Sequence, residues 1–263
     1  MFVQLKAILK RVLPNKIYQF IRILNNLRED LGACIFFLRN EKLDISLLKR
    51  FKILRQLYLI DLNLEPLQTQ EEILSYIQKI LSLPSESEGV VVEAGCYKGN
   101  STAKFSLAAD IANRSLVVFD SFQGLPENDE PHVKNIFGGQ ASFKKGDYCG
   151  PLEEVKSNIS KFGKIDCVRF VEGWFDDTMP KFKDRVACAY LDVDLASSTR
   201  TCLKYLYPLL EKGGILYSQD GHLPLVIKVF DDEKFWVTEV GFKKPTIEGL
   251  GKRKLIKITK ESE

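Results

Sequence analysis

Residues 90–124 contain two short apolar runs, separated by a glycine turn and a helix-like stretch. The first run, Val90 to Val92, is continuous, as expected of a central parallel strand that is buried on both faces. Gly95 and Gly99 flank the turn, and the second run extends from Leu116 to Phe119. Strand, turn, helix and strand in this order form half of a mononucleotide-binding βαβ unit. The chain is therefore expected to fold as a doubly wound α/β sheet.

The ends of these runs indicate the ligand. The glycines allow a close approach of the backbone, and a helix capped by Asn100 to Thr102 presents free N–H groups to an anion. Asp120 ends the second run, where an acid can bind both ribose hydroxyls. The spacing E-x-G-x-x-x-G from Glu93 differs from the dinucleotide pattern G-x-G-x-x-G and favours S-adenosylmethionine. A plain βαβ turn without a ligand is the alternative.

Alternating patterns in the rest of the chain predict a Rossmann-like, mostly parallel sheet of seven strands with helices on both faces. Thr69 and Glu72 form a capping box for a helix that Pro84 ends, so this domain is expected over residues 69–263. Further helices are expected at 43–60, 151–162 and 223–232, with another that Ser197 or Ser198 caps and that ends before Gly213. Further strands are expected at 167–173, 186–194, 214–220, 235–242 and 252–260.

The stretch from residue 123 to 150 lacks strand-like runs and is rich in glycine, proline and charge. A loop of this length inside a compact domain is usually functional or disordered. It follows the carboxyl end of a strand, where open α/β sheets bind ligands. We therefore expect a lid and acceptor-binding loop, with an untethered surface insertion as the alternative.

Residues 1–68 are expected to form a basic, helical appendage. Positions 1–60 hold 12 lysines and arginines against 4 acids, a net charge of +8, whereas the rest of the chain carries −5. Apolar residues at helical spacing suit an amphipathic helix, within residues 1–40, that lies on an anionic membrane surface. A matrix-targeting presequence is the weaker option because the first 28 residues lack serine. Packing of the appendage on the body or on a second subunit, in a homo-oligomer, is the other alternative.

The amino-acid composition indicates the cellular compartment and excludes some kinds of partner. Six scattered cysteines without a C-x-x-C pair indicate free thiols in a reducing cytosol, so the protein is expected to be cytoplasmic. With only His132 and His222 available, a zinc site is disfavoured. Nucleic acid is not an expected partner, because the basic charge lies in the arm rather than around the strand ends.

Oxygen-bearing side chains follow two of the expected strands. Asp192 ends one run, and Gln219 and Asp220 end the next, so these residues are expected on the same rim of the sheet. Such ligands suit a hard divalent cation, Mg²⁺ above all, which would lower the pKa of a hydroxyl acceptor. Asp194 is a spare carboxylate, because alternate residues of a strand share a face. Helix capping and solvated strand ends are the alternative.

The motifs VEAGCYKGNST, FDSFQGLP, GWFDDTMP, LDVDLASST, LKYLYPLLEKGG and YSQDG cover about residues 88 to 222. With them the chain resembles the macrocin O-methyltransferase (TylF-type) family of class I S-adenosylmethionine-dependent methyltransferases. Members of that family methylate sugar hydroxyls and use Mg²⁺. The resemblance implies that Glu93, Gly95 and Ser101 surround the methionine part of the cofactor and that Asp120 binds its ribose. The motifs also place the other expected cofactor-binding residues, Gly99, Ser121, Gly173 and Trp174.

The resemblance implies that Asp192 is a metal ligand and the candidate general base, with Gln219 and Asp220 completing the metal site. His222 is the next candidate base, because it lies two residues past Asp220 on the same rim. The family usually has D-D where this chain has Gln219-Asp220, and a neutral ligand is expected to weaken the ion. It also has D-L-Y-E-S-T where this chain has D-L-A-S-S-T, so an aromatic and an acid near the acceptor are replaced.

The leading functional hypothesis is an O-methyltransferase that acts on a hydroxyl of a sugar or of a small hydroxylated metabolite. Positioning does most of the work in such a displacement, and the metal or Asp192 assists by removing the hydroxyl proton. A non-catalytic protein that binds S-adenosylmethionine and acts as an interaction module is the second hypothesis. A nicotinamide-dependent oxidoreductase is the third, and the missing third glycine counts against it.

Overall fold

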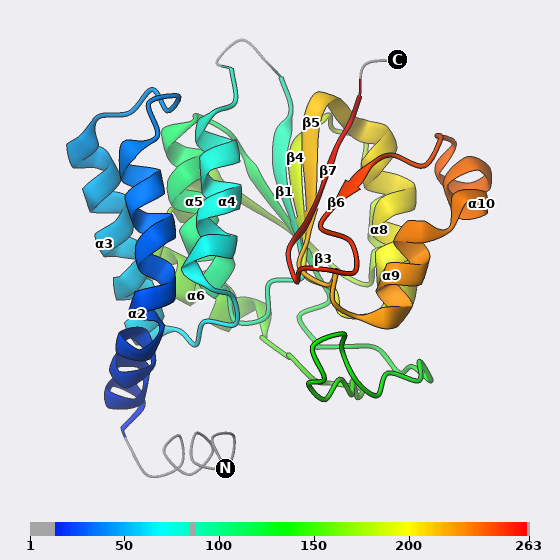
Figure 1. The fold of residues 1–263 in the computed structure, drawn as a ribbon, viewed down its shortest axis with the longest axis horizontal. Helices are drawn as coiled ribbons and strands as arrows, with labels where there is room; N and C mark the ends of the chain where they lie inside the picture. The colour runs from blue at the N-terminus through cyan, green and yellow to red at the C-terminus, as the bar shows by residue number, and fades with distance from the viewer. Residues whose placement is uncertain (1–13, 85–87, 262–263) are drawn as a thin grey trace.

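The structure is a computed structural model that describes residues 14–84 and 88–261 (Figure 1). Its centre is a seven-stranded sheet. The strands follow the order β3 (Val168–Glu172), β2 (Leu116–Asp120), β1 (Val90–Ala94), β4 (Val186–Leu191), β5 (Leu210–Ser218), β7 (Ile256–Thr259) and β6 (Ile247–Glu248). β7 is antiparallel to β5 and β6, and all other pairs are parallel. The predicted fold class is confirmed.

Helices cover both faces of the sheet (Figure 1). One layer contains α2 (Asn15–Arg39), α3 (Leu47–Asn63), α4 (Gln70–Leu81), α5 (Asn100–Ile111) and α6 (Leu152–Phe162), with the short turn η1 (Ile165–Cys167). The other contains α7 (Phe175–Thr178), η2 (Met179–Lys181), α8 (Ala196–Leu209), α9 (Pro224–Asp231), α10 (Glu233–Phe235) and η3 (Trp236–Val240). Within the described ranges, no helix combines the length and the apolar character that crossing a membrane requires.

The sheet separates two hydrophobic cores. Val91 packs in the core under α2 to α6, whereas its neighbour Val92 packs in the core under α8 and α9. Successive residues of a strand point to opposite faces, so the continuous apolar run of β1 serves both cores. Phe37 of α2 and Leu57 of α3 are fully buried in the first core. The described part of the arm therefore packs on the body, while the division of the chain at residue 68 stays a prediction.

A buried ion pair joins α3 to α5. Lys104 Nζ lies 2.6 Å from Asp61 Oδ1, and the two side chains are 0% and 6% exposed. Asp61 also accepts hydrogen bonds from Gln70 Nε2 at 2.6 Å and from Asn100 Nδ2 at 2.9 Å. Gln70 begins α4 and Asn100 begins α5, so one carboxylate holds three helices together.

Two of the predicted helix starts, those of α5 and α8, differ from the prediction, whereas that of α4 agrees with it. The capping box of Thr69 and Glu72 is confirmed. By contrast, α5 starts after Gly99, which has the left-handed backbone conformation, and no side chain caps this helix. The side chains of Asn100 to Thr102, which were expected to cap it, are buried. Likewise, no serine caps α8. Its first two N–H groups, those of Ala196 and Ser197, donate to the Glu130 carboxylate, both at 2.8 Å.

The elements after α8 also differ in part from the prediction. The strand expected at 235–242 is wrong, because these residues form α10 and η3. Asp232 caps this helical segment by accepting a hydrogen bond from Phe235 N, and Trp236 is buried beside α8. The strand at the outer edge, which pairs with β7 on the side away from β5, is β6, and the sequence reasoning missed it. α8 ends at Leu209, directly after Pro208 and before Gly213 as expected, but Gly213 lies inside β5 instead of ending the helix.

The buried ion pair leads to a stability prediction. Lys104→Met leaves the Asp61 carboxylate buried without a countercharge, and removing one partner of a buried pair typically costs about 3–5 kcal/mol. We expect a loss of this size in the free energy of unfolding, measured by urea denaturation with circular dichroism. Lys156→Met breaks the exposed pair with Glu153 and serves as the control, with a loss below about 1 kcal/mol. Equal losses in the two variants would show that the buried pair contributes no more to the free energy of unfolding than the exposed pair does.

Candidate functional site

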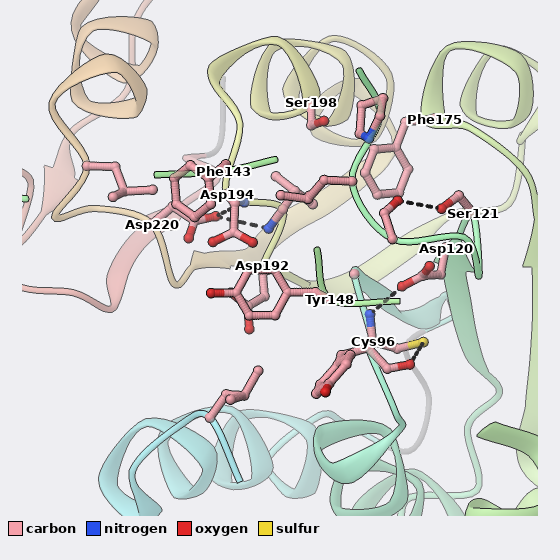
Figure 2. A pocket seen from close by; sticks show the side chains of 18 of the residues that line it. Cys96, Asp120, Ser121, Phe143, Tyr148, Phe175, Asp192, Asp194, Ser198 and Asp220 are labelled. Carbon is pink, nitrogen blue, oxygen red and sulfur yellow. Dashed lines mark hydrogen bonds between the residues drawn. The ribbon is translucent and has the colours of Figure 1, made fainter. Parts of the chain in front are cut away.

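A cavity of about 480 Å³ lies at the carboxyl ends of the parallel strands. This is the edge where open α/β sheets bind ligands, and the volume is that of a small-molecule site. Asp120 and Cys96 stand on one side of the cavity, and Asp192, Asp194 and Asp220 on the other (Figure 2). The wall is completed by the ends of β2 and β3, by the 123–150 loop and by residues 65–68 before α4.

The turn between β1 and α5 brings two of the predicted residues to the cavity. Gly95 has φ +83°, and a Cβ at this position would lie 2.0 Å from the backbone oxygen of Asp192. A glycine is thus required for the turn to cross the end of β4. Gly95 and Ser101 line the cavity, whereas Gly99 does not and instead faces Val155 of α6.

Asp120 ends β2 at the same side of the cavity. Its Oδ2 accepts a hydrogen bond from Cys96 N at 2.8 Å, and its Oδ1 accepts one from Phe122 N at 2.7 Å. Burial raises the pKa of Asp120, and these backbone donors oppose that shift. Each carboxylate oxygen keeps a further lone pair, so hydroxyl donors from a ligand can still be accepted. The neighbouring predicted residues that line the cavity are Ser121, Gly173 and Trp174.

Glu93 lies beneath the turn and is not part of the cavity wall. Its side chain is fully buried on β1. Burial raises its pKa to about 8, and the nearby charge of Asp192 raises it as well. The Glu93 carboxyl therefore keeps its proton at neutral pH.

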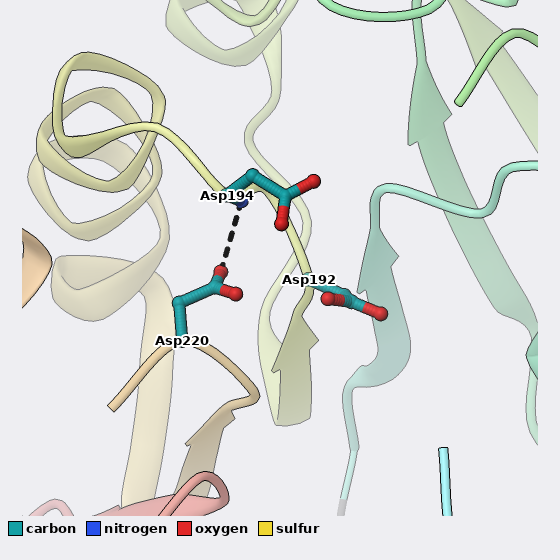
Figure 3. Close-up of side chains that lie close together, drawn as sticks. All are labelled: Asp192, Asp194 and Asp220. Atoms are coloured by element: carbon teal, nitrogen blue, oxygen red, sulfur yellow. Dashed lines mark hydrogen bonds between the residues drawn. The ribbon is translucent and has the colours of Figure 1, made fainter. Parts of the chain in front are cut away.

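Three carboxylates meet at the ends of β4 and β5 (Figure 3). Asp192, Asp194 and Asp220 each offer an oxygen, and these oxygens lie within 4.8 Å of one another. Asp220 Oδ2 accepts hydrogen bonds from the N–H groups of Val193 and Asp194, both at 3.0 Å. Burial raises the pKa of Asp192, brings that of Asp220 to about 7 and raises that of Asp194 well above its usual value. The group called the acid cluster below consists of these three residues.

Gln219 is not brought into the acid cluster. Its side chain is fully buried, and its Oε1 accepts a hydrogen bond from the Tyr190 hydroxyl at 2.8 Å. Asp220, the next residue, lines the cavity, so the pair that follows β5 sends its side chains to different surroundings. Asp194 supplies the third oxygen that the sequence reasoning expected from Gln219.

His222 lines the cavity next to the acid cluster. Its ring stacks on Phe137 with centroids 6.2 Å apart, and its carbonyl accepts a hydrogen bond from Ile136 N. Burial, together with the charge of Lys254, lowers the pKa of His222 to about 4. The imidazole is therefore neutral at physiological pH.

Several cavity residues lay outside the sequence reasoning. Gln68 Nε2 donates a hydrogen bond to Asp192 Oδ2 at 2.6 Å, although 124 positions separate the two residues. Lys254, just before β7, also lines the cavity. The only available signal for Lys254 was its place at the start of a closing strand. Gln68 had none, because it lies in a stretch that was expected to be a linker.

The 123–150 loop contributes a large part of the wall. Phe143 and Tyr148 line the cavity. In the view of Figure 2, Tyr148 lies between Asp120 and the acid cluster. The loop is tied to α8 through Glu130, and the His132 ring nitrogen Nε2 lies 2.9 Å from the Glu130 carboxylate. Its expected role as a lid and acceptor-binding loop stays a prediction.

Comparisons with known proteins agree with this architecture. A family model for macrocin-O-methyltransferase (TylF) matches residues 72–233. Mycinamicin III 3''-O-methyltransferase of Micromonospora griseorubida is 34% identical over 143 residues, covering 52% of this chain and 56% of the relative. The 8-demethyl-8-(2,3-dimethoxy-alpha-L-rhamnosyl)-tetracenomycin-C 4'-O-methyltransferase of Streptomyces olivaceus is 36% identical over 138 residues, covering 50% and 52%. The chain thus spans about half the length of the curated relatives it matches.

The fold also has a counterpart among solved structures. The structure of the O-methyltransferase NovP superposes with a TM-score of 0.62 at 24% identity, covering 76% of this chain and 84% of that one. At this level of identity the likeness is one of fold.

The raised pKa of Glu93 leads to a prediction about pH. Between its usual value of 4.5 and the folded-state value of about 8, the folded protein keeps a proton that the unfolded chain has lost. The resulting stabilisation is complete below the lower value and is lost as the pH rises through the upper one. We expect Glu93→Gln to remove this decline, which can reach about 1.4 kcal/mol per pH unit. Urea unfolding at pH 5.5, 7 and 8.5 measures it.

Glu153→Gln, at an exposed carboxylate, is the matched control for that experiment. It should leave the pH profile of the unfolding free energy unchanged. If Glu93→Gln gives a profile parallel to that of the unaltered protein, the carboxyl is ionised in the folded state and the assigned protonation is wrong.

Proposed function

Because this chain belongs to the macrocin-O-methyltransferase (TylF) family, we propose that it transfers a methyl group from S-adenosylmethionine to a hydroxyl. The observation that carries the proposal is that one cavity has Asp120 and the glycine turn on one side and the acid cluster on the other. The name of one relative describes O-methylation of mycinamicin III, and the name of another describes O-methylation of a tetracenomycin that bears a rhamnosyl group. We therefore propose a sugar or glycosylated metabolite as the acceptor.

We assign the Asp120 side of the cavity to the cofactor. Asp120 would accept hydrogen bonds from the ribose hydroxyls, since its oxygens keep free lone pairs. The turn at Gly95 and the first turn of α5 at Ser101 would face the methionine part, where free backbone N–H groups suit a carboxylate. Trp174, 36% exposed in the cavity wall, offers an aromatic surface to the adenine.

We assign proton removal to Asp192. In the transfer, the acceptor oxygen forms a bond to the methyl carbon while the carbon–sulfur bond breaks, and the hydroxyl proton passes to the carboxylate. Desolvation raises the pKa of Asp192, which makes it a stronger base than an exposed aspartate. Gln68 donates to one of its oxygens and fixes the orientation of the group. The neutral ring of His222 is the second candidate base.

The acid cluster fits a divalent cation. Asp192 and Asp220 each use one oxygen to accept hydrogen bonds, so their other oxygens and those of Asp194 stay available. Hard oxygen ligands are those that Mg²⁺ prefers. We propose that these three residues, without Gln219, would hold the ion, which when bound supplies positive charge to an ionising acceptor hydroxyl.

A crossed pair of variants tests the function. Asp120→Asn should weaken S-adenosylmethionine binding at least tenfold in calorimetry, because an amide accepts fewer hydroxyl donors than a carboxylate. Asp192→Asn should leave this binding intact but lower turnover about 100-fold or more, since it removes the base. Turnover is measured as S-adenosylhomocysteine release with a panel of glycosides.

Each variant is the control for the other. Retained turnover in Asp192→Asn would remove this residue as the base and leave His222. Binding of the cofactor by the unaltered protein without any turnover across the panel would favour the non-catalytic alternative.

We also propose that α2 contacts an anionic membrane surface. Its outward side carries a row of apolar residues that are 40–53% exposed, namely Ile17, Phe20, Leu24, Leu31 and Ile35. Their spacing places them on one side of the helix. The first 60 residues carry a net charge of +8, which complements anionic lipid, whereas the rest of the chain carries −5. Exposed apolar residues with basic neighbours are typical of helices that lie in a membrane interface.

Point variants test this contact, because deleting residues 1–40 would remove the buried Phe37 from the core. Leu24→Glu combined with Leu31→Glu should abolish co-sedimentation with phosphatidylserine vesicles at low salt. Val133→Glu combined with Val237→Glu, at exposed apolar positions away from α2, is the matched control and should leave sedimentation unchanged. A lipid-free dimer in analytical ultracentrifugation that the α2 variant dissociates would assign the row to a second copy instead.

A further inference from the structure

Lys254 stands opposite the acid cluster because of the way β7 closes the sheet. β7 runs antiparallel to β5, with Ser218 opposite Ile256. Beyond this pair, the chain continues to Asp220 after β5, and Lys254 precedes β7. Gly221 N donates a hydrogen bond to the Lys254 carbonyl at 3.0 Å, which holds this part of the backbone in place.

Gly221 shows how closely the two segments pack. A Cβ on Gly221 would lie 2.2 Å from Ile256 Cγ2 and 3.1 Å from the backbone oxygen of Arg253. Only a glycine permits this contact, so the segment before β7 is pressed against the end of β5. The Lys254 side chain consequently lines the same cavity as Asp192, Asp194 and Asp220.

The charge of Lys254 acts on the whole acid cluster. Lys254 and the three carboxylates line one cavity, so their charges interact across it. With all three carboxyls ionised, the acid cluster and the ammonium together carry a net charge of −2 rather than −3. The Lys254 ammonium thus already neutralises part of the negative charge that a bound cation would neutralise in an isolated acid cluster.

We infer that Lys254 is a positioning residue that supplies a fixed positive charge to the acid cluster and weakens divalent-cation binding there. The repulsion between an ammonium and a cation in one cavity is strong where water is scarce. Lys254 lies outside residues 72–233, so this charge comes from a part of the chain that the family model does not match. The inference rests on the proposed role of the acid cluster but not on methyl transfer.

Manganese binding to the full-length protein, followed by electron paramagnetic resonance of the free ion, tests the inference without an acceptor. The unaltered protein should bind Mn²⁺ weakly, with Kd on the order of 10⁻³ M, in the range of weak oxygen-ligated sites. Lys254→Met should tighten binding at least tenfold, because it removes the repelling charge. Lys252→Met is the matched control, since Lys252 is an exposed residue of the same segment, and it should change nothing.

Two further variants keep the test decisive. Lys254→Gln replaces the methionine variant if that protein does not fold, and it should also tighten binding. Adding Asp194→Asn to the lysine variant should abolish the gain if the acid cluster is the site. Equal Mn²⁺ affinity with and without Lys254, or a gain that survives Asp194→Asn, would overturn the inference. Absent turnover with the expected Mn²⁺ pattern would count against the proposed function alone.

Discussion

The Lys104–Asp61 ion pair is the constraint on which the arrangement of the site depends. A lysine without exposed surface requires a countercharge, so α5 can pack in the core only with α3 beside it. Asn100, the first residue of α5, donates to Asp61 and also to the Leu64 carbonyl at 3.1 Å. That contact fixes the segment after α3, which carries Gln68 to Asp192. A region expected as an appendage thus reaches the centre of the cavity.

The cavity concentrates negative charge at one end of a buried space. Asp192, Asp194 and Asp220 share a small volume, and Glu93 lies behind them beneath the β1 turn. Burial raises the pKa of all four carboxyls, so each of them holds a proton more readily than an exposed carboxyl would. Perturbed carboxyls that gather in a cleft are typical of functional sites.

The sequence predicted those parts of the site that depend on strand ends. Asp120 and Asp192 directly follow apolar runs, and the edge they occupy follows from parallel topology. The surroundings of the Gln219 side chain could not be predicted, because the strand ends at Ser218, after which alternation no longer fixes the direction of a side chain. Partners from distant positions, such as Gln68, leave no local signal. The prediction of a strand at 235–242 was wrong because the apolar residues of this segment suit a strand and a buried helix equally. The hydrogen bond that the Asp232 side chain accepts from Phe235 N caps the segment as a helix.

The wall over the acid cluster follows from an unusual helix cap. No serine or acid from its own chain neighbourhood caps α8, so its free N–H groups draw the Glu130 carboxylate from a loop 66 positions away. Glu130 also lies 2.9 Å from His132 Nε2, and the His132 ring packs edge-on against Phe143 with centroids 4.9 Å apart. Phe143 lines the cavity. The charge requirement of one helix terminus is therefore transmitted through two side chains to the surface that an acceptor would meet. In this chain the 123–150 loop and the α8 terminus form one unit, and loss of the hydrogen bond from Ala196 N–H would alter the cavity wall although Ala196 does not line it.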